Sequence, residues 1–139
     1  MKVAHINIIG EIWNGGVSLE NVKNAINANA DAEQIHVHIH SGGGEVIEGF
    51  AIYDALKGSG KIVHTFVEGL SGSIASVIMM AGTERHATPN SQIFIHNPFG
   101  MAGGDAEQVQ QYADELKKWE TKILPHMGDP VNAAPFEEN

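Results

Sequence analysis

The sequence predicts an α/β fold in which a mostly parallel sheet is built from repeated strand–helix units. Two observations support this prediction. Segments rich in β-branched residues alternate with segments whose apolar residues recur at helical spacing, and glycine or serine stands at most of the boundaries. The chain has 139 residues, which is enough for one domain with a core of its own.

The first half of the chain predicts two strands and two helices. Residues 3–9 (VAHINII) predict a buried strand that ends at Gly10. Ser18 is placed to cap a helix of roughly ten residues. Residues 35–40 (IHVHIH) predict a second strand, and the apolar spacing of residues 45–56 predicts a second helix.

The next segments continue the alternation. Residues 61–69 (KIVHTFVEG) predict a third strand, and residues 92–96 (QIFIH) predict a fourth. Between them, residues 73–81 are almost wholly apolar and predict a helix that is buried on all sides.

The last part of the chain predicts one long polar helix, from Asp105 to about Leu124, followed by an irregular tail. The tail, residues 125–139, has three prolines and no periodicity. We therefore expect one domain over residues 1–124 and a separate tail. The helix carries an apolar stripe, which either packs on its own domain or is buried in an oligomer; it consists of Val109, Tyr112, Leu116, Trp119 and Ile123.

Composition excludes several classes of function. The formal net charge is −9 and there is no long basic run, which argues against a nucleic-acid partner. Without cysteine the chain has no disulfide, thiolate metal site or cysteine nucleophile. The start of the sequence does not resemble a signal peptide, and the longest apolar run, residues 74–81, is too short to span a bilayer. We expect a soluble, cytoplasmic protein with no membrane partner.

Two motifs outside the serine-rich region carry weaker chemical signals. His36, His38 and His40 share one face of the second predicted strand, where imidazoles can bind zinc or iron. The preferred interpretation is a strand with a polar or half-buried face. The segment GSGK at 58–61 is not a phosphate-binding loop, because Ala55 replaces its first glycine and Ile62 its serine or threonine.

The segment GLSGSIAS, residues 69–76, leads from a predicted strand into the buried helix with serine at the junction. A nucleophile can be held on such a turn, with the amides of the helix N-terminus facing an oxyanion. The motif G-x-S-x-G is not met at Ser71 or Ser73. On this segment alone, the preferred interpretation is that Ser73 merely caps the helix.

Three motifs in order change that balance: SGGG followed by EVIEGFAIYDAL, then GLSGSIASVIMMAG, then TPNSQIFIHNPFG. Together they resemble the ClpP family of serine proteases, and more narrowly the head-maturation (prohead) proteases of tailed bacteriophages. The resemblance runs from about Ile6 to about Leu124. Crotonase-type acyl-CoA enzymes and signal-peptide peptidases share a related fold, but IHNP after PNS points to ClpP. The resemblance implies a ClpP/crotonase-like fold with a protruding handle helix at about 104–124.

The resemblance also implies roles for individual residues. Ser73 would be the nucleophile and His96 the general base, and the backbone amides of Gly44 and Ile74 would form the oxyanion hole. Ser71 and Ser76 are weaker candidates for the nucleophile. No metal or cofactor is implied, and the residues expected to bind substrate are Gly43, Gly72 and Asn97.

The chain departs from the family in three places. The acid that completes the family's triad follows the handle helix. Here the only aspartate in the tail is Asp129, and its context does not match, so the acid is unassigned. In another protease, losing that carboxylate costs on the order of 10⁴ in rate. Three interpretations of the unassigned acid are left open: a truncated chain, a naturally shortened copy, or a chain that takes its acid from elsewhere. His40-Ser41-Gly42 replaces the family's Asn-Ser-Pro, which makes the loop less pre-organised. Because the first predicted strand begins almost at once, we expect no N-terminal extension of the kind that docks an unfoldase.

The expected function is therefore a serine endopeptidase that cleaves phage scaffold or capsid protein. It would work as a heptameric ring or stacked rings, in the host cytoplasm or the procapsid. Two alternatives remain open: a catalytically impaired, ring-forming copy kept for assembly or binding, and an acyl-CoA enzyme of the crotonase type.

Overall fold

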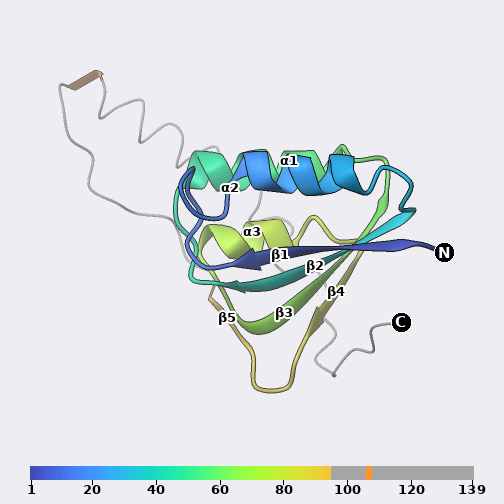
Figure 1. The fold of residues 1–139 in the computed structure, drawn as a ribbon. Helices are drawn as coiled ribbons and strands as arrows, with labels where there is room; N and C mark the ends of the chain where they lie inside the picture. The colour runs from blue at the N-terminus through green and yellow to red at the C-terminus, as the bar shows by residue number, and fades with distance from the viewer. Residues whose placement is uncertain (95–105, 108–139) are drawn as a thin grey trace.

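The computed structural model describes residues 1–94 and 106–107, and its described part is a parallel sheet with helices on one face (Figure 1). This confirms the predicted α/β class with a mostly parallel sheet. The strands are β1 (Val3–Ile9), β2 (Gln34–Ser41), β3 (Ile62–Gly72), β4 (Glu84–Ala87) and β5 (Gln92–Phe94). The helices are α1 (Leu19–Ala28), α2 (Val46–Lys57) and α3 (Ile74–Met79).

The sheet has the order β1-β2-β3-β4, and β5 also pairs with β3. β3 is long enough to pair with both β4 and β5. Its first half pairs with β4, and its last residues, 70–72, pair with β5. The register between β2 and β3 shifts beyond Ile39, where β3 carries extra residues that include Gly69 at φ 124°. This irregularity lies at the ends of the strands where the serine junction begins.

The sheet buries one face under α1, α2 and α3, and none of these described helices covers the other face (Figure 1). Along β1, Ala4, Ile6 and Ile8 are buried, whereas His5, Asn7 and Ile9 are exposed. The prediction of a buried first strand is therefore correct for one face and wrong for the other. The reason is its position: β1 is at the edge of the sheet, and none of the helices that the structure describes lies over its second face.

Most sequence-predicted boundaries agree with the structure to within a few residues. The hydroxyl of Ser18 accepts a hydrogen bond from the amide of Asn21 at 3.2 Å, which confirms the predicted cap of α1. β3 extends three residues beyond its predicted end at Gly69. β4 was not predicted, because its four residues, ERHA, show no apolar alternation. The last two residues of the predicted strand 92–96 lie outside the described residues.

α3 is buried on all sides, as its composition predicts, and every one of its six residues is buried. It packs against both α2 and β3. The hydroxyl of Thr65 on β3 donates to the carbonyl of Met79 at 2.7 Å, which satisfies one of the free carbonyls at the helix end. The helix that follows Ser73 is thus fixed from both sides.

Contact between α2 and α3 depends on Gly49. A Cβ at this position would overlap the side chain of Ile74, which is itself 1% exposed and cannot move away. In an exposed helix the change from glycine to alanine would stabilise by about 1 kcal/mol. We expect the opposite for Gly49→Ala, a loss of about 1–3 kcal/mol in the free energy of unfolding, because the core is overpacked.

Urea denaturation of Gly49→Ala and of Glu48→Ala, its neighbour on α2, tests this expectation. Glu48→Ala removes a partly exposed side chain and should change the unfolding free energy by less than about 0.5 kcal/mol. A stabilised Gly49→Ala protein would contradict the close packing of α2 on α3.

The predicted handle helix falls almost entirely outside the described residues. Ala106 and Glu107 are described, and both are helical and exposed. The predicted tail, residues 125–139, also lies outside the described part. Among the helices that are described, none is long and apolar enough to cross a membrane.

Candidate functional site

Ser73 stands between β3 and α3 in a backbone conformation that few residues other than glycine adopt. Its φ is 52° and its ψ is −125°, and no other non-glycine residue in the described part has a positive φ. The side chain makes no capping hydrogen bond to α3, so Ser73 does not act as the side-chain cap that the segment alone had suggested. Strained residues of this kind cluster at active sites, where the surrounding structure holds them in place.

The backbone around Ser73 is held on both sides. Its amide donates to the carbonyl of Phe94 on β5 at 3.1 Å. Its carbonyl accepts from the amide of Ser76 at 3.0 Å and from the Ser76 hydroxyl at 2.6 Å. These bonds fix the strained turn, and they place Phe94, the last residue of the first described segment, directly beside Ser73.

The other two serines of the junction are closed to substrate. Ser71 and Ser76 are both 0% exposed, whereas Ser73 is partly exposed. The Ser71 hydroxyl has no hydrogen-bond partner among the described residues, and the Ser76 hydroxyl is used by the backbone of Ser73. Of the three, only Ser73 has a hydroxyl that a substrate can reach.

The glycine loop after β2 lies directly against Ser73. A Cβ built on Gly43 would stand 2.9 Å from the Cβ of Ser73 and 3.3 Å from the amide nitrogen of Ile74. Gly43 has φ +104°, and its amide donates to the hydroxyl of Ser41 at 3.1 Å. Glycine is required at position 43 for two reasons: the backbone conformation, and the close approach of the loop to the backbone of residues 72–74.

The next glycine is held by the loop that follows β1. Gly44 has φ +154°, and a Cβ there would overlap the backbone of Ile12. The amide of Ile12 donates to the carbonyl of Gly43 at 3.0 Å, and its carbonyl accepts from the amide of Glu45 at 2.8 Å. Ile12 therefore holds the loop on both sides of Gly44. This restraint supplies rigidity that the missing proline would otherwise have given, and no feature of the sequence indicated it.

A groove of about 520 Å³ opens along the glycine loop. Its floor and walls are formed by residues from the ends of β1 and β2 and from β3, namely Ile9, Gly10, Glu11, His40, Ser41, Gly42, Gly43, Gly44 and Leu70. One carboxylate, one imidazole and apolar side chains thus line a groove that includes Gly43, which lies against Ser73. This is a suitable surface for an extended peptide.

The structure brings several of the sequence-predicted site residues together. Ser73, Ile74, Gly43 and Gly72 are mutual neighbours, since the carbonyl of Gly72 would lie 2.9 Å from a Cβ on Gly43. Gly44 adjoins them but faces Ile12. Two further predicted site residues, His96 and Asn97, lie outside the described residues, as does Asp129.

The histidines of β2 do not form a metal site by themselves. His36 and His38 are buried on the face of the sheet without helices, whereas His40 is exposed, with its ring beside Gly69. Among the described residues there is no group of three or more His, Cys, Asp or Glu side chains placed to hold a metal ion. The interpretation of a strand with a partly buried polar face agrees with this arrangement.

Comparison with known proteins gives a consistent result. The family described as Clp protease matches residues 6–131 of the chain. The chain is 39% identical over 97 residues to the ATP-dependent Clp protease proteolytic subunit of Porphyromonas gingivalis, covering 66% of this chain and 44% of that protein. It is 41% identical over 91 residues to the subunit of Ligilactobacillus salivarius, covering 64% and 46%. For subunit 2 of Thermobifida fusca the identity is 37% over 97 residues, covering 66% and 48%. The matched region thus spans less than half the length of these relatives.

Proposed function

Because the chain belongs to the Clp protease family, we propose that it is a serine endopeptidase with Ser73 as its nucleophile. The observation that carries this proposal is the backbone of Ser73. A partly exposed serine is held at φ 52° between a strand and a buried helix, with a glycine loop in contact with it. The relatives compared above are named proteolytic subunits, which agrees with a peptidase.

His96 is the proposed general base. It follows Phe94 by two residues, and two residues span at most about 7 Å. The carbonyl of Phe94 is hydrogen-bonded to the amide of Ser73, so the described chain reaches the nucleophile two positions before His96 in the sequence. A neutral imidazole there would accept the Ser73 hydroxyl proton as the oxygen attacks the peptide carbonyl, and would then donate it to the leaving amine. Asn97, the next residue, is proposed to bind substrate.

Backbone amides are the proposed oxyanion hole. The resemblance assigns the amides of Gly44 and Ile74 to this role, with Gly43 and Gly72 as substrate-binding backbone. Support comes from the contact between the glycine loop and Ser73-Ile74. Because Gly43 is the glycine closer to Ser73, its amide is a second candidate donor, and it would have to exchange its bond to the Ser41 hydroxyl for one to the oxyanion.

The orienting acid of the triad remains unassigned in this proposal. Among the described carboxylates, Glu68 is already bonded to His38 at 2.6 Å. A chain without an orienting acid would keep the fold and the nucleophile but lose much of its rate. That outcome is the non-catalytic, ring-forming alternative, and it makes activity the property to measure first.

A fluorophosphonate probe tests the proposal. The expected result is a covalent adduct on the full chain that mass spectrometry of tryptic peptides maps to Ser73. A chain that forms heptamers by light scattering, yet takes up no probe and hydrolyses neither casein nor peptides, would instead be the assembly form of the fold. Binding of a CoA thioester without peptide hydrolysis would support the crotonase-type alternative.

The narrower role in phage head maturation is part of the same proposal. Its support is the resemblance of the three sequence motifs to phage head-maturation proteases. The relatives named above are instead ATP-dependent Clp protease proteolytic subunits of bacteria. Incubation with a capsid precursor and its scaffold is the direct test, with casein as the comparison substrate. Cleavage of the precursor at defined sites would support this role, and equal, unselective cleavage of both would favour general degradation.

A further inference from the structure

The outer edge of β1 carries backbone groups that the described sheet does not use. In the described part of the chain, β1 pairs only with β2. The amide of Gly10 donates to the carbonyl of His40 at 3.0 Å. Before the start of the strand, the carbonyl of Lys2 accepts from the amide of Glu33 at 3.1 Å, so the even-numbered residues face β2. Successive residues of a strand direct their N–H and C=O groups to opposite sides. The residues whose groups are directed away from β2 are therefore Val3, His5, Asn7 and Ile9.

No feature of the sequence of β1 blocks this edge. Proteins usually protect an open edge with lysine, proline or a bulge. The seven residues VAHINII contain neither lysine nor proline, and their register with β2 is regular from Val3 to Ile9. Unpaired N–H and C=O groups need hydrogen-bond partners, and another extended backbone supplies them in the right spacing. The edge thus offers a template roughly 20 Å long for an added strand.

A groove of about 460 Å³ lies beside this edge. It is lined by residues of β1, by Glu11 and Trp13 of the loop that follows β1, and by residues of α1. The loop is held in place by its own backbone: the amide of Trp13 donates to the carbonyl of Val17 at 3.0 Å, and the amide of Val17 donates to the carbonyl of Glu11 at 2.9 Å. Trp13 is 43% exposed, so its ring offers an apolar surface to a bound chain.

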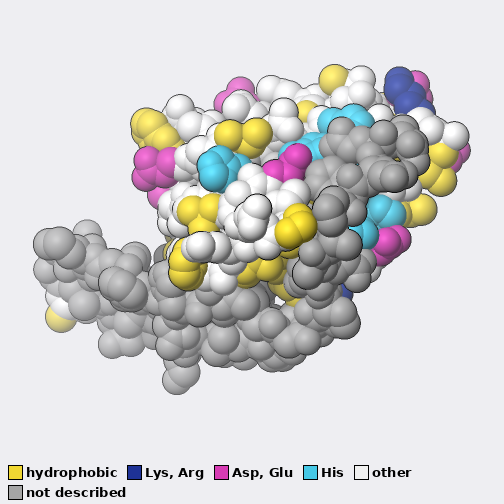
Figure 2. Space-filling view, turned by 90° about the horizontal axis from the view of Figure 1, so that it is seen from below, with side chains coloured by type: hydrophobic (Ala, Val, Ile, Leu, Met, Phe, Trp, Pro, Cys, Tyr) yellow, Lys and Arg dark blue, Asp and Glu magenta, His cyan; other side chains and the backbone are white. Residues whose placement is uncertain are grey.

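The charge of the groove favours a basic occupant. Glu11 is the one carboxylate among the lining residues, which include no lysine or arginine. β1 runs toward the left in Figure 1, and Figure 2 keeps that direction; on its left side acidic side chains are seen, and no described basic side chain is. A lysine or arginine of a bound chain would meet the carboxylate of Glu11 and could lie on the ring of Trp13.

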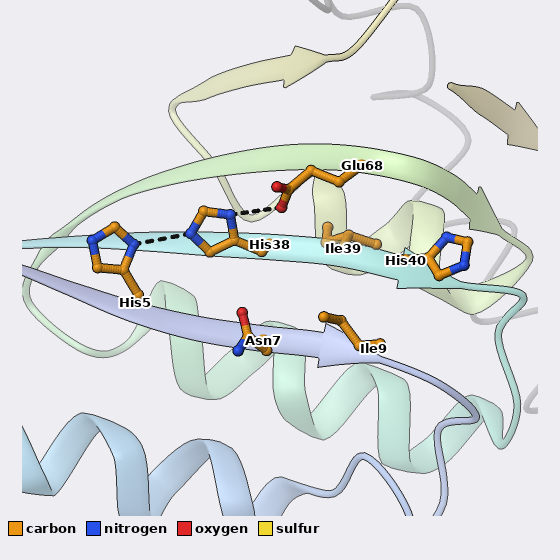
Figure 3. A pocket seen from close by; sticks show the side chains of 7 residues that line it. All are labelled: His5, Asn7, Ile9, His38, Ile39, His40 and Glu68. Atoms are coloured by element: carbon orange, nitrogen blue, oxygen red, sulfur yellow. Dashed lines mark hydrogen bonds and ion pairs between the residues drawn. The ribbon is translucent and has the colours of Figure 1, made fainter. Parts of the chain in front are cut away.

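The edge groove is continuous with the groove at the glycine loop, because Ile9, Gly10 and Glu11 line both. Figure 3 shows the side chains of His5, Asn7 and Ile9 in a row along β1, on the side away from α1. They therefore leave the backbone of β1 open to an added strand. A chain bound along β1 would pass Ile9–Glu11 and reach the glycine loop, which lies against Ser73.

We propose that the edge of β1 binds an extended, basic segment of polypeptide by strand addition, with a lysine or arginine side chain beside Glu11. In this mode of recognition the main-chain hydrogen bonds give affinity and the side-chain contacts give specificity. The identity of the segment rests on the proposed function: for a peptidase, it is a part of the substrate chain outside the bond that is cleaved. The edge of β1 then holds the substrate while another part of it lies at Ser73.

Fluorescence anisotropy on the full chain carrying Ser73→Ala measures this binding without cleavage. The probe is a fluorescein-labelled nonapeptide of alternating valine and lysine. Asn7→Pro removes an outward N–H and puts a ring where the added strand would lie, and edge strands tolerate proline at such positions. We expect the affinity to fall at least about tenfold. Asn7→Ala keeps the N–H and should bind within about threefold of the parent. Equal affinity of the two variants, or no binding to the parent, would overturn the proposal.

Glu11→Lys tests the charge preference and does not depend on how well Asn7→Pro folds. It should weaken binding of the valine–lysine peptide about tenfold and make a valine–glutamate peptide the better ligand. The matched control is Glu20→Lys, the same charge change at an exposed position of α1 that does not line the groove, and its effect should stay within about threefold. An unchanged preference in Glu11→Lys, or an equal change in Glu20→Lys, would contradict a basic segment beside Glu11.

The outcome is separate from that of the peptidase proposal. Peptide binding is measured without hydrolysis, so its failure leaves the fluorophosphonate test of Ser73 unaffected. A chain that binds the valine–lysine peptide at β1 but takes up no fluorophosphonate would keep the strand-addition site and lose the peptidase function.

Discussion

Replacing Ser73 by alanine is expected to abolish peptide hydrolysis, with a loss in kcat on the order of 10⁶ if the enzyme behaves like the best-studied serine proteases. The reason is chemical, because no other hydroxyl in the junction can take over the attack. Ser71 and Ser76 are completely buried, and the Ser76 hydroxyl is engaged by the carbonyl of Ser73. The measurement is the rate of cleavage of a fluorogenic peptide, together with loss of fluorophosphonate labelling.

Ser71→Ala is the matched control for this experiment. It removes a hydroxyl two residues away, in the same strand end, that has no hydrogen-bond partner among the described residues. Deleting a buried, unsatisfied polar group does not cost a hydrogen bond, so we expect stability that is unchanged or slightly higher and activity within a few-fold of the parent. If Ser71→Ala lost all activity while Ser73→Ala kept it, the nucleophile would be misassigned.

Much of the fold was predictable from local sequence patterns. The uninterrupted apolar run of α3 indicated a buried helix, and the serine before Leu19 indicated the start of α1; both features depend on residues close together in the chain. β4 was missed because its stability comes from pairing with β3 rather than from its own residues. The open second face of β1 was also missed, since a strand's sequence does not specify whether it lies at an edge.

The candidate site was predictable only in part, and the family resemblance supplied most of it. Ser73 and the glycine loop could be identified as site residues from the sequence. The strained φ of Ser73 could not, because it depends on hydrogen bonds with Phe94 and Ser76 that exist only in the folded chain. The hydrogen bonds of Ile12 with the glycine loop likewise join backbone groups more than thirty residues apart in the sequence. Every residue type has these backbone groups, so the sequence does not indicate such bonds. The hydrogen bond between His5 and His38 could not be predicted either, because the two side chains are brought together only by the register of β1 on β2.

The close contact of the glycine loop with Ser73 leads to a prediction of comparable size. Gly43→Ala is expected to lower kcat/KM by at least 10²-fold, the usual effect of disturbing one oxyanion donor. The added methyl group would stand 2.9 Å from both the Cβ of Ser73 and the carbonyl oxygen of Gly72, so the loop must move away from the nucleophile. The positive φ of Gly43 adds strain of about 1–3 kcal/mol to the folded state.

Gly42→Ala separates this effect from a general change in the loop. A Cβ on Gly42 meets only Leu70, at an ordinary contact distance of 3.8 Å, and Gly42 is not in the left-handed region. Its kcat/KM and unfolding free energy should stay close to those of the parent. The rates are compared at a temperature where circular dichroism shows all three proteins to be folded, so that lost stability is not counted as lost catalysis. Full activity in Gly43→Ala under these conditions would mean that the amide of Gly43 does not hold the oxyanion and that the reaction does not need the close contact of Gly43 with Ser73.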